Sequence, residues 1–165
     1  MTWLDEIQDL SALIGGILSI VHPTLYQVGL QAFKHLASDT STVQEHNRYL
    51  QILKLWTTPF SGMSVISNRE TPIHRDVQSR HSWYDILLTL GDYSNGRIEL
   101  PSLGVRLQYD PGTVVALAGK VVPHGVPECD GNRVCLAYFM RNNVHERAGV
   151  PIGSWMTSDT YKDVL

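Results

Sequence analysis

The sequence predicts a mainly β fold, a jelly roll preceded by helices. The apolar spacing changes from helical to strand-like near Pro59, and turn residues then divide the chain into short segments. Seven or eight short strands at this spacing are typical of a sandwich or barrel, and helices segregated before them would pack on one sheet. We expect a single domain, in which 1–58 form a helical support, 59–147 a jelly-roll core and 148–165 a tail.

Three helices are predicted before the strands. Apolar residues recur at intervals of three and four over 4–18 and again over 25–36, which is the period of an amphipathic helix. Pro23 stands just before the second stretch, where it suits a first helical turn. A third apolar face runs over 49–56.

Short strands separated by turn chemistry follow. Asn95-Gly96 and Asp130-Gly131 are the clearest turn signals between them. Jelly rolls commonly hold a ligand between their sheets, so this part of the chain is where we expect a site. The candidate strands are 62–67, 83–90, 96–100, 105–109, 113–117, 120–125 and 133–141.

The composition is that of an ordinary soluble protein. Of 165 residues, 43% are hydrophobic and 18% charged, and the net charge is -3 with a pI of about 6.1. A nucleic-acid partner stays open, although no run of Lys and Arg supplies a strong basic patch. The apolar run 13–21 is too short to span a membrane, and Cys129 and Cys135 are expected as free thiols. We therefore expect a soluble intracellular protein, nuclear or cytoplasmic, with no membrane partner.

A His-x-Asp motif and a distant histidine predict a metal site. On an extended segment, residues two apart share a face, so His74 and Asp76 would point together while Ile73 and Val77 point away and pack. His124 lies in a strand-like stretch and is the expected third ligand. Two imidazoles and one carboxylate bind one face of a non-haem Fe(II) and leave the other open, which makes these three residues the expected catalytic centre.

The other histidines are weaker candidates. His81 is the main rival, although it would share one loop with the other two ligands. His145 lies beyond the last predicted strand. The remaining three lie in or beside the helices and are expected to face solvent, namely His22, His35 and His46.

An oxygenase with this metal site needs two more electrons than its substrate supplies. The usual source is 2-oxoglutarate, which chelates iron through its keto acid and needs a cation at its far carboxylate. Arg suits that role because its planar fork binds a carboxylate through two parallel hydrogen bonds and keeps its charge. Arg133 is the candidate, and Arg141, eight residues later on the same face, is the alternative anchor.

A hairpin would bring Arg133 to the metal. A two-residue loop at Asp130-Gly131 pairs His124 with Ala137 and Glu128 with Arg133. Paired residues share a face, so His124 and Arg133 would both look into one cavity. The competing interpretation is that Arg133 only pairs with Glu128 on an exposed hairpin.

A series of motifs resembles a known family. Its members on this chain are His74-Arg75-Asp76, Gly91-Asp92-Tyr93-Ser94-Asn95-Gly96, Tyr109-Asp110-Pro111-Gly112-Thr113, His124-Gly125-Val126 and Arg133-Val134-Cys135. Together they resemble the Fe(II)- and 2-oxoglutarate-dependent dioxygenases, especially the fungal members of the TET/JBP-like oxygenase group. The resemblance covers roughly 62–141.

The resemblance implies a double-stranded β-helix and a set of cofactor contacts. Iron would be bound by His74, Asp76 and His124, and the 2-oxoglutarate carboxylate by Arg133. Many relatives carry Ser or Thr two residues after that Arg, where this chain has Cys135, a weaker donor. Tyr84, at the start of a predicted strand, is a further candidate to hydrogen-bond 2-oxoglutarate or else a core aromatic.

The sequence therefore predicts a dioxygenase that uses Fe(II), 2-oxoglutarate and O2 to hydroxylate a C–H bond and releases succinate and CO2. The methyl of a modified nucleobase in DNA or RNA is one expected substrate. A small metabolite or a protein side chain is the alternative substrate. The alternative function is that of a non-catalytic cupin-like domain that binds a metal or ligand. Arg133 distinguishes the dioxygenase from the non-catalytic binding domain, because a domain that only binds metal does not need a buried cation.

Overall fold

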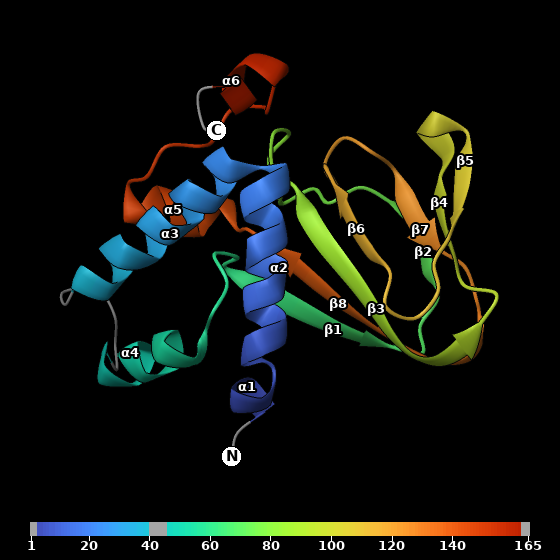
Figure 1. Cartoon of the computed structure of the whole chain (residues 1–165). Coiled ribbons are helices and arrows are strands. Elements are labelled where there is room, and N and C mark those ends of the chain that lie inside the picture. Colours follow the sequence, from blue (N-terminus) through green and yellow to red (C-terminus); the bar gives the residue numbers. More distant parts are fainter. Residues whose placement is uncertain (1–2, 40–45, 163–165) are drawn as a thin grey trace. The chain divides into compact units, whose positions relative to one another are not determined.

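The computed structural model describes residues 3–39 and 46–162 and divides into two compact units. One unit contains the chain up to Ser61 and again from Asn142 onward, and the other is Gly62–Arg141 (Figure 1). The first unit is helical, and the second contains all the described strands.

The helical unit contains the three helices that the sequence predicts. The first is interrupted at Ile7, and Pro23 occupies the first turn of the third described helix, as expected. His22 differs from expectation, because it is buried and its Nδ1 accepts a hydrogen bond from the Leu25 N–H at 3.1 Å. An unsatisfied N–H at the helix start explains why this histidine turns inward. The helices before the strands are α1 (Trp3–Glu6), α2 (Gln8–Val21), α3 (Pro23–Ser38) and α4 (His46–Leu55).

Two short helices follow the strands in a part of the chain where the sequence shows no clear element. They are α5 (Asn142–Ala148) and α6 (Ser158–Lys162). Helix α3 packs against α2, α4 and α5, and its Ala32 and Leu36 share an apolar cluster with Ala148 and Val150. No helix in the described ranges is both long and apolar enough to cross a membrane.

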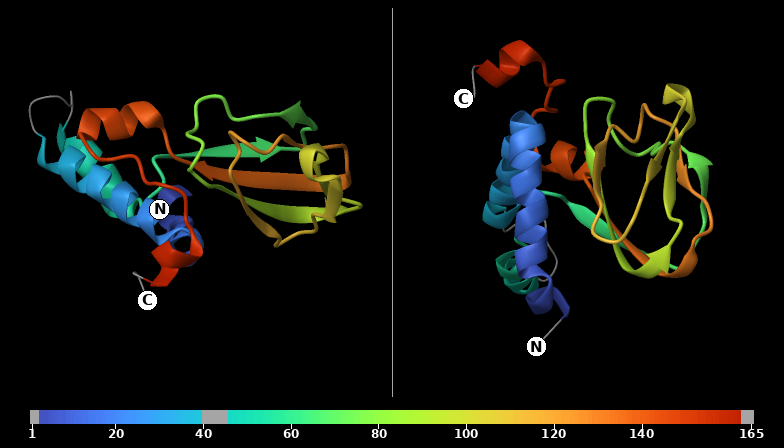
Figure 2. Two further views of the ribbon diagram at one scale, coloured as in Figure 1. Left: turned by 90° about the horizontal axis from the view of Figure 1, so that it is seen from above. Right: turned by 45° about the vertical axis from the view of Figure 1, so that its right-hand side comes forward.

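In the described ranges, eight antiparallel strands form two four-stranded sheets, which confirms the predicted jelly roll (Figure 2). The strand order is β1-β8-β3-β6 in one sheet and β2-β7-β4-β5 in the other. Side chains that point between the sheets form the core of this unit, including the buried Ile98, Leu100 and Val126. The strands are β1 (Gly62–Ser67), β2 (Thr71–His74), β3 (Asp85–Ser94), β4 (Arg97–Leu100), β5 (Val105–Gln108), β6 (Val114–Leu117), β7 (His124–Val126) and β8 (Asp130–Phe139).

The predicted hairpin between 124 and 137 is wrong. Strand β8 already begins at Asp130, and Asp130 and Gly131 lie opposite Ser94 and Tyr93 of β3. The other clear turn signal, Asn95-Gly96, does lie between two strands, β3 and β4, and Asn95 adopts a left-handed conformation with φ 58°. Because β3 continues to Ser94, it provides a ladder partner for residues that the sequence assigns to a loop. Strand β7 consequently pairs with β2 and β4 of the other sheet.

Candidate metal centre

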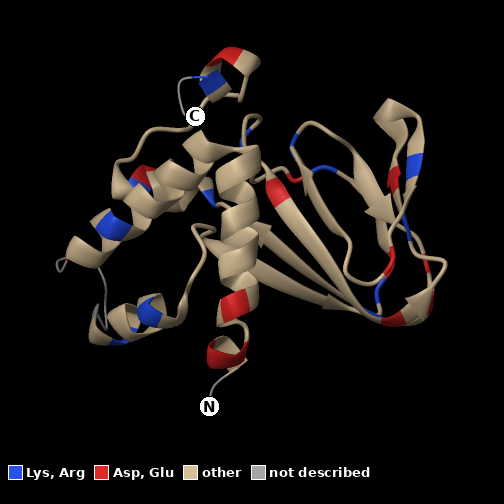
Figure 3. Cartoon of the chain, in the orientation of Figure 1, with Lys and Arg blue, Asp and Glu red and all other residues tan. Residues whose placement is uncertain are grey.

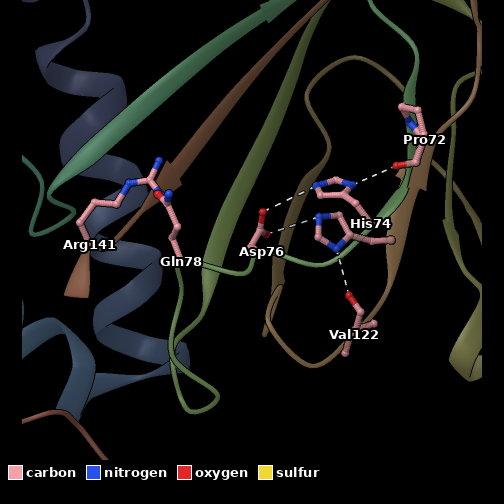
Figure 4. Close-up of polar contacts among 7 residues, drawn as sticks. Pro72, His74, Asp76, Gln78, Val122 and Arg141 are labelled. Atoms are coloured by element: carbon pink, nitrogen blue, oxygen red, sulfur yellow. Dashed lines mark hydrogen bonds and ion pairs between the residues drawn. The ribbon is translucent and has the colours of Figure 1, made fainter. Parts of the chain in front are cut away.

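Three potential metal ligands meet where β2 and β7 pair. His74 ends β2, His124 begins β7, and the two are opposite each other in the ladder. Asp76 lies in the loop after β2 (Figure 4). One donor atom from each residue can be chosen so that all three lie within 4.8 Å of one another. The structure thus brings together the three residues that the sequence singles out.

Backbone carbonyls orient both imidazoles. Nδ1 of His74 lies 2.9 Å from the Pro72 carbonyl oxygen, and Nδ1 of His124 lies 3.0 Å from that of Val122 (Figure 4). A carbonyl only accepts, so each Nδ1 carries a proton, and in the neutral form of each ring the lone pair is on Nε2. Both Nε2 atoms face Asp76, at 3.6 Å from its two carboxylate oxygens. Such outer hydrogen bonds are typical of histidines that bind metal.

The loop after β2 positions Asp76. The strand ends at His74, and the Asp76 N–H donates to the Gly119 carbonyl at 3.0 Å. Ile73 and Val77, expected to pack, are exposed by 46% and 75%. The expected alternation does not extend along the whole motif, because the chain leaves the ladder after His74.

Gly119 leaves room for two carboxyl groups. A Cβ at this position would collide with Oδ2 of Asp76 and with Oδ2 of Asp85, a residue that the sequence did not indicate. The Asp85 carboxyl is buried, and neither oxygen has a donor within the described ranges. Burial and then the Asp76 carboxylate raise the pKa of Asp85 well above its usual value, while Arg141 opposes the shift.

The triad extends from the interior to the surface. The His124 side chain is 6% exposed, whereas those of His74 and Asp76 are 41% and 39% exposed. Burial lowers the pKa of His124, against the opposing effects of its hydrogen bond to Val122 and the Asp76 carboxylate. Burial therefore favours the neutral imidazole of His124, the form that binds a metal. At His74 the site is open to solvent, so that ligands can exchange there.

A cavity of about 190 Å³ adjoins the triad within the unit Gly62–Arg141. His81 is exposed and Tyr84 half-buried, and both lie outside its lining. Its lining includes residues of both sheets: Ser64, Ile66, Thr71, His74, Asp76, Asp85, Leu87, Tyr109, His124, Val126, Arg133, Cys135, Ala137 and Arg141. Arg133 and His124 do share a cavity, but they approach it from opposite sheets.

Arg133 is a buried cation in this lining. Its side chain is 2% exposed, and Nη2 donates to the Arg69 carbonyl at 2.6 Å. Its backbone N–H donates to the Asn68 side chain at 2.8 Å. In the described chain Nε has no acceptor, and neither Glu128 nor another acid forms an ion pair with Arg133. A buried guanidinium without a carboxylate favours binding of an anion.

Two further groups stand in the same lining. Cys135 is buried, and its Sγ lies 3.6 Å from the hydroxyl of the fully buried Tyr109. Burial raises the pKa of both groups, so both carry their protons at neutral pH. The sequence did not indicate Tyr109 as a site residue, because it follows β5 and reaches the cavity only when the sheets stack. Cys129 and Cys135 are both free, as expected.

Arg141 differs from Arg133 in its surroundings. Its guanidinium stacks 4.2 Å from the centroid of the Phe139 ring. Its Nη1 donates to the Gln78 side chain at 2.5 Å, and Figure 4 shows these two residues. Its side chain is only partly buried. Along the described chain, Lys and Arg are interspersed with Asp and Glu (Figure 3).

Comparisons with known proteins give the family. The family model Tet_JBP, described as the oxygenase domain of the 2OGFeDO superfamily, matches residues 2–142. A solved structure of NgTET1 in complex with 5mC DNA matches with a TM-score of 0.59 and 17% identity, covering 98% of this chain and 58% of that one. The chain thus spans little more than half of that structure. No curated protein matches.

The resemblance drawn from the motifs agrees with the family model, and the jelly roll agrees with the fold of the solved structure. The match extends well beyond the metal motif, since it includes the helical residues before β1 and all eight strands. The chain belongs to the Tet_JBP family, the oxygenase domain of the 2OGFeDO superfamily, which uses Fe(II), 2-oxoglutarate and O2.

Proposed function

We propose that this domain is an Fe(II)- and 2-oxoglutarate-dependent dioxygenase that hydroxylates a C–H bond. One observation carries the proposal: two imidazoles and a carboxylate, with donor atoms within 4.8 Å, adjoin the same cavity as an arginine that is buried without an acidic partner. A site that only stores metal has no use for such a cation. A co-substrate with a carboxylate at one end and a metal-chelating group at the other uses both features.

In this proposal His74, Asp76 and His124 hold Fe(II), and the donor set fits that metal because it mixes imidazole with carboxylate and occupies one face. Bound iron supplies the oxidation in which 2-oxoglutarate and O2 become succinate and CO2 while a C–H bond becomes C–OH. Arg133 binds the far carboxylate of 2-oxoglutarate, and its backbone contacts keep the guanidinium in place beforehand.

The leading substrate is the methyl group of a modified nucleobase in DNA or RNA. Membership of the Tet_JBP family supports this choice, as does the likeness to a structure of NgTET1 bound to 5mC DNA. The half-exposed His74 and Asp76 leave the metal reachable from the surface, which a large substrate requires. Because basic residues are dispersed, few of them can contact phosphates together, so we expect the domain by itself to bind nucleic acid weakly and with only a shallow salt dependence.

The test is turnover by the Fe(II)-loaded protein. The expected result is succinate formation from 2-oxoglutarate, together with addition of one oxygen to 5-methylcytosine in an oligonucleotide and none to a matched oligonucleotide with cytosine. Succinate without a nucleobase product would assign the activity to a small metabolite or a protein side chain. Tight metal binding with no succinate under any condition would leave a non-catalytic binding domain and refute the proposal.

A further inference from the structure

Next to Arg133 the cavity contains a phenol whose hydroxyl has only a weak partner. Tyr109 is fully buried, and the one contact of its hydroxyl in the described structure is the Cys135 Sγ at 3.6 Å. A thiol is a weak hydrogen-bond partner. Because a buried O–H without a good acceptor is costly, such a group is expected to have an acceptor when the site is filled.

The backbone of Tyr109 is held on both sides. Its N–H donates to the Gly96 carbonyl at 3.0 Å, and its own carbonyl accepts from the Tyr93 hydroxyl at 2.6 Å. The Tyr93 hydroxyl also lies 2.8 Å from the Thr89 hydroxyl. A Cβ at Gly96 would collide with the Tyr109 carbonyl oxygen, so only glycine permits this approach. The Tyr109 backbone is thus held before any ligand binds, and its ring is fully buried, which reduces the entropy lost on binding.

The phenol shares its surroundings with the buried cation. Arg133 is close enough to oppose the pKa rise of both Tyr109 and Cys135, although burial dominates and both groups stay protonated. All three residues line the cavity. A protonated phenol beside a guanidinium offers one neutral and one charged donor to the same anion.

We infer that the Tyr109 hydroxyl donates a hydrogen bond to the carboxylate that Arg133 binds. It thereby supplies the neutral donor that the thiol of Cys135, two residues after the arginine, supplies poorly. The inference rests on the proposed function, since it adds one contact to the same 2-oxoglutarate. Tyr109 is then a specificity-determining residue for the co-substrate and takes no part in holding the metal.

Binding of 2-oxoglutarate to the Mn(II)-loaded protein, measured by calorimetry without O2, tests the inference without turnover. Tyr109→Phe removes only the hydroxyl and is expected to weaken 2-oxoglutarate binding about tenfold, the effect of one hydrogen bond to a charged group. Mn(II) affinity is expected to stay unchanged. Tyr138→Phe is the matched control, because Tyr138 is also fully buried and lines the cavity from β8, and it is expected to change binding less than about twofold.

A rescue separates a direct contact from a structural effect. Cys135→Ser in the Tyr109→Phe background places a hydroxyl beside Arg133 and is expected to restore most of the lost affinity. Cys135→Ala alone is expected to change affinity less than about twofold, since a thiol is a weak donor.

Three results with these variants would contradict the inference. An unchanged affinity in Tyr109→Phe would overturn it, and weakening in Cys135→Ala but not in Tyr109→Phe would assign the contact to the thiol. Failure of Cys135→Ser to restore the affinity of Tyr109→Phe would indicate a structural role. If instead the unaltered protein binds Mn(II) but no 2-oxoglutarate, the proposed function fails first and the inference fails with it. If Arg133→Ala loses 2-oxoglutarate binding while Tyr109→Phe keeps it, the inference fails and the proposed function stands.

Discussion

The two walls of the cavity are built differently. The sheet β2-β7-β4-β5 contributes both histidines from strands of only four and three residues, β2 and β7. The opposite sheet contributes Arg133 and Cys135 from β8 and Asp85 from β3, and each of these strands has ten residues. The first wall presents the half-exposed His74 beside the buried His124, whereas the polar groups of the second wall are all buried.

The difference shows how one fold serves two needs. Exchange of metal, O2 and substrate needs access, and short strands next to loops allow it. An unpaired buried cation needs surroundings that cannot relax around it, and β8 provides them because it is hydrogen-bonded along one edge to β1 and along the other to β3. Substitutions on the first wall should therefore affect metal binding, and those on the second should affect co-substrate binding or stability.

The largest effect is expected from the metal wall. Asp76→Ala removes the only carboxylate of the triad and should lower Fe(II) affinity by more than about 100-fold and abolish succinate formation. Asp92→Ala, on an exposed position of β3, is the control and should leave both unchanged. Fe(II) binding by equilibrium dialysis measures the effect, and undiminished binding in Asp76→Ala would disprove the triad.

The next largest effect is expected on 2-oxoglutarate affinity, and it should differ between Arg133 on β8 and Arg141 just after that strand. Arg133→Ala should weaken 2-oxoglutarate binding by about 100-fold, as expected when one partner of a buried charge pair is removed, while metal affinity stays the same. Arg141→Ala should change it less than about threefold, because that guanidinium is already paired with Gln78 and Phe139. The reverse ranking in calorimetric titrations would make Arg141 the anchor.

Gly119→Ala should produce a smaller loss on the metal side. The added methyl group collides with the carboxylates of Asp76 and Asp85, so Asp76 must move and Fe(II) affinity should fall about tenfold. Gly16→Ala serves as control, because a Cβ there meets nothing within 4 Å. Equal affinities in the two variants would show that the loop around Asp76 adapts freely.

The smallest effect concerns the pH dependence of stability in the metal-free protein. The pKa of Asp85 is raised in the folded state, so its stabilising contribution is full below the unfolded value of 3.8 and is lost as pH rises through the folded pKa. Asp85→Asn has no carboxyl to ionise, so it does not lose this stability as the pH rises. Its Tm at pH 8 should exceed that of the unaltered protein by about 2–4 °C, the change that roughly 1 kcal/mol produces in a chain of this size.

The Tm difference for Asp85→Asn should disappear toward pH 4, as thermal melts across this range will show. Asp92→Asn, an exposed carboxyl on the same strand, should show no such trend. A variant that is less stable than the unaltered protein at pH 8 would mean that the Asp85 carboxylate is stabilised by a partner when ionised.

Much of the fold was predictable from local pattern. Alternating apolar residues and turn chemistry indicated the jelly roll, and β1 has the expected bounds. The packing of the helices on one sheet stays a prediction. The hairpin failed because Asp130-Gly131 carries a strong turn signal that a long-range ladder with β3 overrides. Local propensity is a weak guide where distant strands compete for the same backbone groups.

The sequence by itself determined which chemistry is available: His74, Asp76 and His124 have the types and spacing of a metal triad, and Arg133 is the type that binds a carboxylate. Only the tertiary structure decided how they meet. His124 and Arg133 approach one cavity from opposite sheets, and Tyr109 and Asp85 join it from strand ends with no local signal. The physical reason is that residue type is a property of the chain, whereas burial and proximity arise only when two sheets stack and exclude water.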